Sequence, residues 1–143
     1  MNVRDEHTRS LWMGVPVADA PALSRPERAD VVVVGSGIAG LSVAYELVAR
    51  GRSVIVLDRG AIGSGMTART TAHLASALDD GYKELIGVRG EDCARLSYQS
   101  VVAAIDRAEA IQTKERIDCD FRRIDGYWVQ ARDTPESHLD EEI

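Results

Sequence analysis

The sequence predicts an α/β fold built on a parallel sheet, and three adjoining features predict it. Residues 31–34 are consecutive valines, and such a β-branched run is typical of a strand that is covered on both faces. A glycine-rich turn over residues 35–40 follows directly and leads into apolar residues at helical spacing. A second apolar strand over residues 53–57 then ends at Asp58. Together these elements predict the βαβ unit of a Rossmann-type domain.

The boundaries of this unit are also marked in the sequence. The helix is predicted to extend to Arg50, because Gly51 stands where a helix C-terminal glycine belongs. Residues 1–29, ahead of the unit, are polar and proline-containing, so we expect an extended lead-in without a core of its own. Within this lead-in, Leu11 and Trp12 leave two interpretations open: they pack the lead-in against the domain, or they belong to a contact that is missing.

A long loop and further helices are predicted after the unit. Residues 59–80 are rich in glycine and hydroxyl side chains and are expected to enter a short helix late; loops of this length are usually functional. Asp79 and Asp80 are expected to cap a helix near Tyr82. A longer helix is predicted over residues 90–115. The side chains expected to form its buried stripe are Tyr98, Val101, Val102, Ile105, Ala108 and Ile111.

The C-terminal part of the chain is predicted to change to strands. Residues 121–124 and 127–131 resemble two short strands joined by a hairpin turn at residues 125–126. A helix-start signal follows at residues 134–136. Because the chain stops inside the second turn of that helix, we expect it to be a fragment or a truncated gene product.

Composition and charge argue against several classes of protein. A net charge of −6 over 143 residues argues against a nucleic-acid partner, since phosphate binding needs a basic face. No apolar run approaches the length that spans a bilayer, and no signal peptide is recognised. Cys93 and Cys119 lack the spacing of a metal site, so we expect them to be small apolar fillers. These features predict a cytoplasmic protein with no membrane segment and no metal.

The glycines of the turn have separate tasks in binding a dinucleotide. Gly35 permits the turn out of the strand, Gly37 lets the backbone approach a pyrophosphate, and Gly40 allows the helix to pack closely on the sheet. The free N–H groups and the dipole of the first helical turn attract phosphates. The candidate pyrophosphate site therefore consists of Gly35, Ser36, Gly37, Ile38, Ala39 and Gly40.

Asp58, at the end of the second strand, bears on which dinucleotide is bound. Its carboxylate can accept hydrogen bonds from the 2′- and 3′-hydroxyls of an adenosine ribose and would repel a 2′-phosphate, which argues against NADP. FAD and NAD both remain open on this evidence. An NAD-binding half normally continues into another βα unit, whereas here a loop rich in hydroxyl side chains follows, and this favours FAD.

A resemblance to a known family is carried by residues 31–74, VVVVGSGIAGLSVAYELVARGRSVIVLDRGAIGSGMTARTTAHL. This run resembles the N-terminus of FAD-dependent amine and amino-acid oxidoreductases, the D-amino-acid oxidase and glycine oxidase superfamily. Three shorter segments resemble a bacterial branch in which a C-terminal Rieske iron–sulfur domain often follows the FAD domain. They are SLW at residues 10–12, RTTAHL at residues 69–74 and IDCDFRRIDGYW at residues 117–128.

The resemblance implies roles for individual residues. It places Gly35, Gly37 and Gly40 at the pyrophosphate, Asp58 at the adenosine ribose, and Arg59 against the adenine or its ribose. A further set is implied to pass the pyrophosphate and the ribityl chain toward the isoalloxazine. That set comprises Thr67, Arg69, Thr70, Thr71, Ala72 and His73.

The activity implied by the resemblance is oxidation of a C–N bond in an amine or amino acid, with a hydride equivalent passing to the flavin. Residues 30–143 are then an incomplete FAD-binding domain that ends with the first substrate-domain strands near residues 119–131. Catalytic residues are not identified, and a Rieske domain would be an electron-transfer partner outside this chain. Two alternatives remain open: an NAD-dependent dehydrogenase, and a non-catalytic nucleotide-binding fragment.

Overall fold

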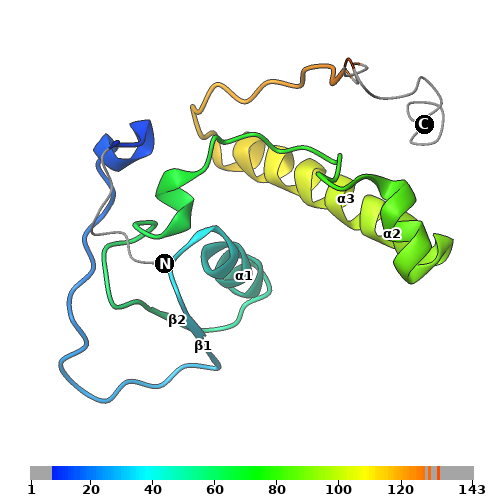
Figure 1. The fold of residues 1–143 in the computed structure, drawn as a ribbon. Helices are drawn as coiled ribbons and strands as arrows, with labels where there is room; N and C mark the ends of the chain where they lie inside the picture. Colours follow the sequence, from blue (N-terminus) through cyan, green and yellow to red (C-terminus); the bar gives the residue numbers. More distant parts are fainter. Residues whose placement is uncertain (1–7, 128, 130–131, 133–143) are drawn as a thin grey trace. The chain divides into compact units, whose positions relative to one another are not determined.

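The computed structural model describes residues 8–127, 129 and 132. The chain divides into two compact units, residues 1–72 and residues 73–143, and each is described by itself (Figure 1). The first unit contains the glycine-rich turn and the second consists mainly of two helices.

The first unit has the predicted βαβ arrangement. Strand β1 (Val31–Val34) and strand β2 (Val54–Leu57) pair in parallel, and helix α1 (Ile38–Ala49) connects them and packs against both (Figure 1). Val31 lies opposite Val54, and the register continues without interruption to the last residue of each strand.

Hydrogen bonds outside the ladder fix this register at both ends. At the start, the backbone N–H and the hydroxyl of Ser53 donate to Asp30 Oδ2 at 2.8 and 2.9 Å, and the Asp30 N–H donates back to Ser53 Oγ at 2.9 Å. These bonds stabilise the ionised carboxylate, so they lower the pKa of Asp30. At the far end, the Gly35 N–H donates to the Leu57 carbonyl at 2.7 Å.

Helix α1 ends as its sequence predicts. The Gly51 N–H donates to the Val48 carbonyl at 2.9 Å, and the Arg52 N–H donates to the Leu47 carbonyl at 3.0 Å, which together form a Schellman motif. The motif requires a left-handed residue after the helix, and Gly51 has φ +76°.

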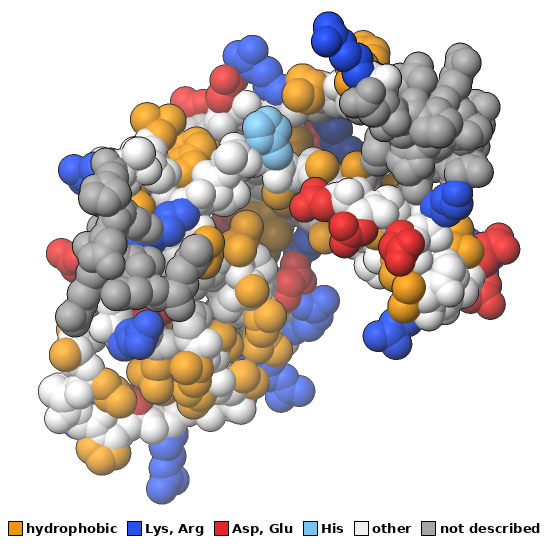
Figure 2. Space-filling view, viewed as in Figure 1, with side chains coloured by type: hydrophobic (Ala, Val, Ile, Leu, Met, Phe, Trp, Pro, Cys, Tyr) orange, Lys and Arg blue, Asp and Glu red, His pale blue; other side chains and the backbone are white. Residues whose placement is uncertain are grey.

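The prediction that β1 is covered on both faces is wrong for this chain. Val31 and Val33 are half-buried, whereas Val32 and Val34 are 53% and 84% exposed. Successive side chains of a strand point to opposite faces, and α1 covers the face that carries Val33. Within the described part of this unit, α1 is the helix that packs on β1, and apolar side chains remain at the molecular surface (Figure 2).

The lead-in is not wholly extended. Leu11–Gly14 form a short 3-10 helix, η2, whose N-terminal Ser10 hydroxyl accepts a hydrogen bond from the Trp12 N–H at 3.3 Å. A second 3-10 helix, η3 (Met66–Arg69), lies in the first half of the long loop, earlier than the sequence predicts, and η2 packs against it. Trp12 Nε1 donates to the Thr70 carbonyl at 2.8 Å, so Trp12 packs the lead-in against the long loop, whereas Leu11 is 79% exposed.

The second unit is a pair of helices, α2 (Gly81–Arg89) and α3 (Glu91–Glu115), that pack against each other (Figure 1). Both lie where the sequence predicts helices. Asp80 precedes α2 as expected, but its side chain makes no capping hydrogen bond. Tyr82 Oη instead joins α2 to the preceding loop by donating to the Ser76 carbonyl at 2.6 Å. The Tyr82 ring meets Tyr98 of α3 edge-to-face at a centroid distance of 5.7 Å.

The predicted stripe of α3 is only half-buried. Val101, Val102, Ile105, Ala108 and Ile111 have intermediate exposure, and Tyr98 is 48% exposed. Ala94, on the same helix, is its one buried apolar side chain in the part of the chain that the structure describes.

The strand predicted at residues 121–124 is not observed. Residues 121–127 form no strand, and the rest of the predicted hairpin beyond them includes positions outside the described residues, as does the predicted helix start at 134–136. A strand forms only where a second strand accepts and donates its backbone hydrogen bonds. This segment is instead held beside α3 by side chains, because the Arg123 guanidinium forms ion pairs with Asp106 at 2.6 Å and Glu109 at 2.7 Å.

The cysteines are not apolar fillers. Cys93 and Cys119 are both free thiols with exposed side chains. Cys93 lies in the first turn of α3, on its exposed side, and Cys119 lies in the segment that follows α3, so neither is packed in a core.

Candidate functional site

The glycine-rich turn begins with a backbone conformation that favours glycine. Gly35 has φ +104°, which lets the chain leave β1 and turn toward the start of α1. Its N–H donates to Leu57, the last residue of β2, so the turn stays tied to the end of both strands. The turn, the start of α1 and the end of β2 therefore meet at one edge of the sheet.

Gly40 brings α1 unusually close to this turn. A Cβ atom built on Gly40 would lie 2.0 Å from the Gly35 carbonyl oxygen and 3.3 Å from Val33 Cγ1. No side chain can be accommodated at 2.0 Å from a backbone oxygen without movement of the helix. The predicted role of this glycine, close helix–sheet packing, agrees with the observed geometry.

The N-terminus of α1 is open to an anion. Gly37 is its N-cap residue and supplies no side-chain cap, and the first turn contains no acidic residue. The N–H groups of Ala39 and Gly40 are in the first turn, where a helix provides no internal acceptor. The positive end of the helix dipole therefore faces the turn without a carboxylate from α1 to oppose it.

Thr67, in η3, contacts this N-terminus from the long loop. The Ile38 N–H donates to Thr67 Oγ1 at 2.9 Å. A Cβ atom on Gly37 would lie 3.1 Å from the same hydroxyl oxygen. The structure thus brings together Ile38 and Thr67, which lie 29 positions apart in the sequence with β2 between them.

Asp58 lies at the same turn and is held by Ser36. The backbone N–H and the hydroxyl of Ser36 donate to Asp58 Oδ2 at 2.6 and 2.7 Å, and the Gly60 N–H donates to Asp58 Oδ1 at 3.0 Å. These hydrogen bonds lower the pKa of Asp58 from 3.8 to about 2, and the two from Ser36 have the largest effect. Ser36 is only 3% exposed, whereas Asp58 is exposed. The carboxylate is therefore ionised at neutral pH, fixed on its inner side and accessible from solvent.

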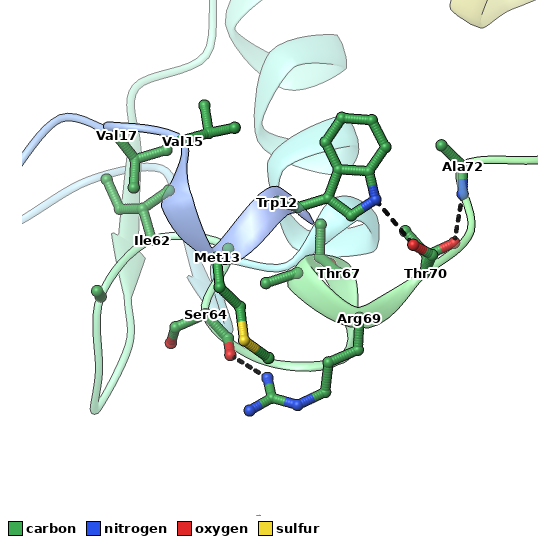
Figure 3. A pocket seen from close by; sticks show the side chains of 13 residues that line it. Trp12, Met13, Val15, Val17, Ile62, Ser64, Thr67, Arg69, Thr70 and Ala72 are labelled. Atoms are coloured by element: carbon green, nitrogen blue, oxygen red, sulfur yellow. Dashed lines mark hydrogen bonds between the residues drawn. The ribbon is translucent and has the colours of Figure 1, made fainter. Parts of the chain in front are cut away.

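The lead-in and the long loop enclose a pocket beside this turn. Its volume is about 460 Å³, and Figure 3 shows Trp12, Val15 and Val17 of the lead-in and Ile62, Thr67 and Thr70 of the loop among the side chains that line it. The pocket is mainly apolar. The remaining lining residues are Met13, Ala61, Gly63, Ser64, Ala68, Arg69 and Ala72.

The structure places the other predicted site residues in different ways. Arg59 follows Asp58 and is exposed. The Arg69 guanidinium donates to the carbonyls of Ser64 and Gly65, both at 2.7 Å, so it braces the loop internally (Figure 3 shows the bond to Ser64). Thr71 is exposed and does not line the pocket.

His73 is the last of the predicted site residues. It is the first residue of the second unit, so its position is described only within that unit.

The seven residues that meet at the turn are Gly35, Ser36, Gly37, Ile38, Gly40, Asp58 and Thr67.

Two features of the site escape prediction from the sequence. Ser36 is predicted only as a member of the turn, and nothing in the sequence shows that its side chain fixes Asp58. The indole N–H of Trp12 donates to the Thr70 carbonyl at 2.8 Å, across 58 residues of chain (Figure 3). A tryptophan in a polar, proline-containing lead-in is a signal of such a contact, although it does not identify the acceptor.

The observed turn fits an adenine dinucleotide. Its glycines leave room for a pyrophosphate at the helix N-terminus, and Asp58 presents an ionised acceptor for ribose hydroxyl groups a short distance away. A 2′-phosphate would meet the negative charge of the Asp58 carboxylate.

Comparison with known proteins agrees with this fit. A family model described as "DAO: FAD dependent oxidoreductase" matches residues 30–143. "Putative Rieske 2Fe-2S iron-sulfur protein YhfW" of Bacillus subtilis is 36% identical over 79% of this chain and 22% of its own length. "Probable oxidoreductase OrdL" of Haemophilus influenzae is 34% identical over 88% of this chain and 29% of its own. The gamma-glutamylputrescine oxidoreductase of Escherichia coli is 30% identical over 96% of this chain and 32% of its own length.

The chain spans less than a third of the length of these relatives. No solved structure gives a significant match. Among the described residues, no helix combines the length and the apolar character needed to cross a membrane. The match of the family model to most of the chain shows that the protein belongs to the DAO family of FAD-dependent oxidoreductases, whose cofactor is FAD.

Proposed function

We propose that this chain provides the adenosine and pyrophosphate part of an FAD site in an oxidoreductase that oxidises C–N bonds of amines or amino acids. One observation carries the proposal: Ser36 joins the ionised Asp58 carboxylate to the turn from which α1 starts. An acceptor for ribose hydroxyls and donors for a pyrophosphate therefore occur side by side, as an adenine dinucleotide requires.

In this proposal the residues of the turn bind and orient the cofactor. The first-turn N–H groups of Ala39 and Gly40 donate to the pyrophosphate, beside the Ile38 N–H that Thr67 Oγ1 holds, and Asp58 accepts hydrogen bonds from the adenosine ribose. Arg59 lies against the adenine or its ribose. The segment that continues past the pyrophosphate and the ribityl chain consists of Thr67, Arg69, Thr70, Thr71, Ala72 and His73.

When bound, FAD supplies the two-electron acceptor for substrate oxidation. The residues described here hold it and exclude a 2′-phosphate, but we assign none of them a catalytic role. Residues 30–143 form part of a Rossmann-type FAD-binding domain in this proposal.

Support for an amine or amino-acid substrate comes from the relatives. The gamma-glutamylputrescine oxidoreductase aligns with nearly the whole chain, and its name describes an enzyme that acts on an amine derivative. A relative named as a Rieske iron–sulfur protein supports an iron–sulfur domain as the electron-transfer partner of the whole protein. Both the substrate and the electron acceptor are proposals for the whole protein.

Competition between partial ligands tests the binding proposal. FAD is bound to the purified protein, and ADP and FMN are each titrated against it while flavin fluorescence is followed. ADP shares the adenosine and pyrophosphate of FAD, so we expect ADP to displace FAD and FMN to displace it weakly. Displacement by FMN but not by ADP would mean that the turn does not bind the adenosine half.

Anaerobic reduction tests the choice of substrate. The FAD-loaded whole protein is mixed with a panel of amines, amino acids and 2-hydroxy acids, and loss of flavin absorbance is measured. We expect an amine or amino acid to reduce the flavin. Reduction by 2-hydroxy acids alone would contradict C–N oxidation and would leave the proposed FAD site unaffected. The panel includes 2-hydroxy acids because a relative named L-2-hydroxyglutarate dehydrogenase is similar over 36% of this chain.

A further inference from the structure

We propose that Trp12, in the lead-in, is a positioning residue of the FAD site and acts through Thr67. The inference rests on the proposed FAD function and extends it to a segment that precedes residue 30, where the match to the family model begins. It concerns the lead-in helix η2, the loop helix η3 and the first residue of α1, all within the first unit.

The contact between η2 and η3 is specific. Trp12 Nε1 donates to the Thr70 carbonyl at 2.8 Å, and Thr70 is the residue that ends η3 (Figure 3). The Thr70 hydroxyl in turn accepts from the Ala72 N–H at 3.2 Å. The indole thus holds the C-terminal end of η3 at the point where the chain turns, and Ala72 there has the positive φ of +63° that few non-glycine residues adopt.

Near its N-terminal end, η3 contacts the cofactor turn. Thr67 Oγ1 accepts from the N–H of Ile38, the first residue of α1, whose neighbours Ala39 and Gly40 carry the proposed pyrophosphate donors. Arg69 ties η3 to the loop before it through the carbonyls of Ser64 and Gly65. A helix of four residues held at its end by Trp12 has little freedom, so the position of Thr67 depends on the indole contact.

The conformation of η2 is also adapted to this contact. Ser10 caps the helix, and the Arg9 guanidinium donates to the Met13 carbonyl at 3.1 Å. Trp12 is 40% exposed, less than its neighbour Leu11 at 79%, although the two are adjacent on the same turn. The lead-in therefore directs its tryptophan onto η3 and leaves the leucine at the surface.

The test measures how Trp12→Phe changes affinity for FAD and for AMP. Phenylalanine keeps an aromatic ring in the pocket and removes only the N–H donor. We expect FAD affinity to fall about tenfold, which is the equivalent of one hydrogen bond, because the bond from Trp12 to the Thr70 carbonyl is lost. AMP reaches Asp58 without needing η3, so its affinity should not change. Leu11→Ala is the matched control from the same turn and should leave both affinities unchanged.

A double-mutant cycle shows whether Trp12 acts through Thr67. Thr67→Val removes the hydroxyl and keeps the shape of the side chain. If the indole acts by placing this hydroxyl, Trp12→Phe should have little further effect on FAD affinity in the Thr67→Val background. Independent, additive losses, or an equal loss of FAD and AMP affinity, would overturn the inference, because a general loss of folding produces such a result.

Amide hydrogen exchange of Ile38, measured by NMR on the ligand-free protein, separates this inference from the proposed function. Trp12→Phe should accelerate exchange at Ile38 several-fold, and Leu11→Ala should not. If the wild-type protein fails to bind FAD, the proposed function fails, but accelerated exchange still supports the coupling from Trp12 to Ile38. Unchanged exchange at Ile38 overturns the coupling even if FAD binds.

Discussion

The side chain of Asp58 accepts two hydrogen bonds from one residue, Ser36, whose N–H and hydroxyl both donate to Oδ2 at 2.6 and 2.7 Å. Ser36 is buried and belongs to the glycine turn, while Asp58 ends the neighbouring strand. The pair therefore fixes the acid at the end of β2 relative to the N-terminus of α1. The two hydrogen bonds from Ser36 are also the largest causes that lower the pKa of Asp58 to about 2.

Replacing Ser36 by alanine should raise the pKa of Asp58 toward its ordinary value of 3.8 without restoring it fully, since the backbone N–H of residue 36 remains. The carboxylate ¹³C shift of Asp58, followed by NMR from pH 1.5 to 6, measures this pKa. An unchanged pKa in Ser36→Ala would show that the hydroxyl does not hold the carboxylate.

The same hydrogen bonds give a pH dependence of stability with a definite sign. The pKa of Asp58 is lower in the folded protein than its ordinary value of 3.8, so the folded state favours the ionised form. This contribution to the free energy of unfolding is fully present above pH 3.8 and is lost as the pH falls through about 2. Asp58→Asn should remove this part of the pH dependence, which urea unfolding at a series of pH values measures. If the free energy of unfolding of Asp58→Asn fell with pH in the same way as that of the wild type, Asp58 would not be the source of this pH dependence.

Gly37→Ala should weaken FAD binding while the protein stays folded. Gly37 has φ −76°, so alanine meets no backbone strain, but its Cβ would lie 3.1 Å from Thr67 Oγ1 and occupy space beside the proposed pyrophosphate. We expect a loss of FAD affinity of at least about tenfold, the equivalent of one lost hydrogen bond. Calorimetric titration gives the affinity, and circular dichroism checks the fold. Wild-type affinity in a folded variant would mean that the pyrophosphate does not approach Gly37.

Gly40→Ala should instead destabilise the fold. The added Cβ would stand 2.0 Å from the Gly35 carbonyl oxygen, so α1 must move away from the sheet, at a cost of about 3 kcal/mol in the free energy of unfolding. Gly87→Ala in α2 is the matched control. A Cβ there meets nothing within 4 Å, and alanine favours a helix over glycine by about 0.5–1 kcal/mol, so the control should be neutral or stabilising. Equal stability of the two variants in urea unfolding would show that α1 is not packed as closely as described.

Tyr82→Phe should destabilise the second unit by about 1 kcal/mol, because it removes the hydrogen bond to the Ser76 carbonyl while keeping the ring contact with Tyr98. Tyr98→Phe keeps the same ring contact and leaves the Tyr82 hydroxyl in place, so we expect it to destabilise the second unit less than Tyr82→Phe does. Thermal unfolding of the two variants compares them. A larger loss in Tyr98→Phe would contradict the assignment of the stabilising bond to Tyr82.

The βαβ unit could be predicted from the sequence because each of its parts has a local cause. The valine run, the left-handed Gly51 and the helical spacing of the apolar residues act over a few residues each, and β1, α1 and β2 appear where predicted. Helices α2 and α3 were predictable for the same reason.

The incorrect predictions depend on distant partners. A run such as residues 121–124 becomes a strand only if another strand pairs with it, and Arg123 instead joins the segment to α3. The exposure of Val34, likewise, depends on what lies against the second face of the sheet. In the candidate site, the turn and Asp58 follow from spacing, whereas the contact of Trp12 with Thr70 depends on how two loops fold together.

The central claim is that the glycine turn and Asp58 bind FAD, and direct titration tests it most closely. FAD, NAD⁺ and NADP⁺ are titrated into the wild-type protein and into Asp58→Ala, with heat and, for FAD, flavin fluorescence followed in parallel. We expect saturable FAD binding that Asp58→Ala weakens, with NADP⁺ binding least. Absence of FAD binding in a folded sample, or FAD binding that is indifferent to Asp58→Ala, would contradict it.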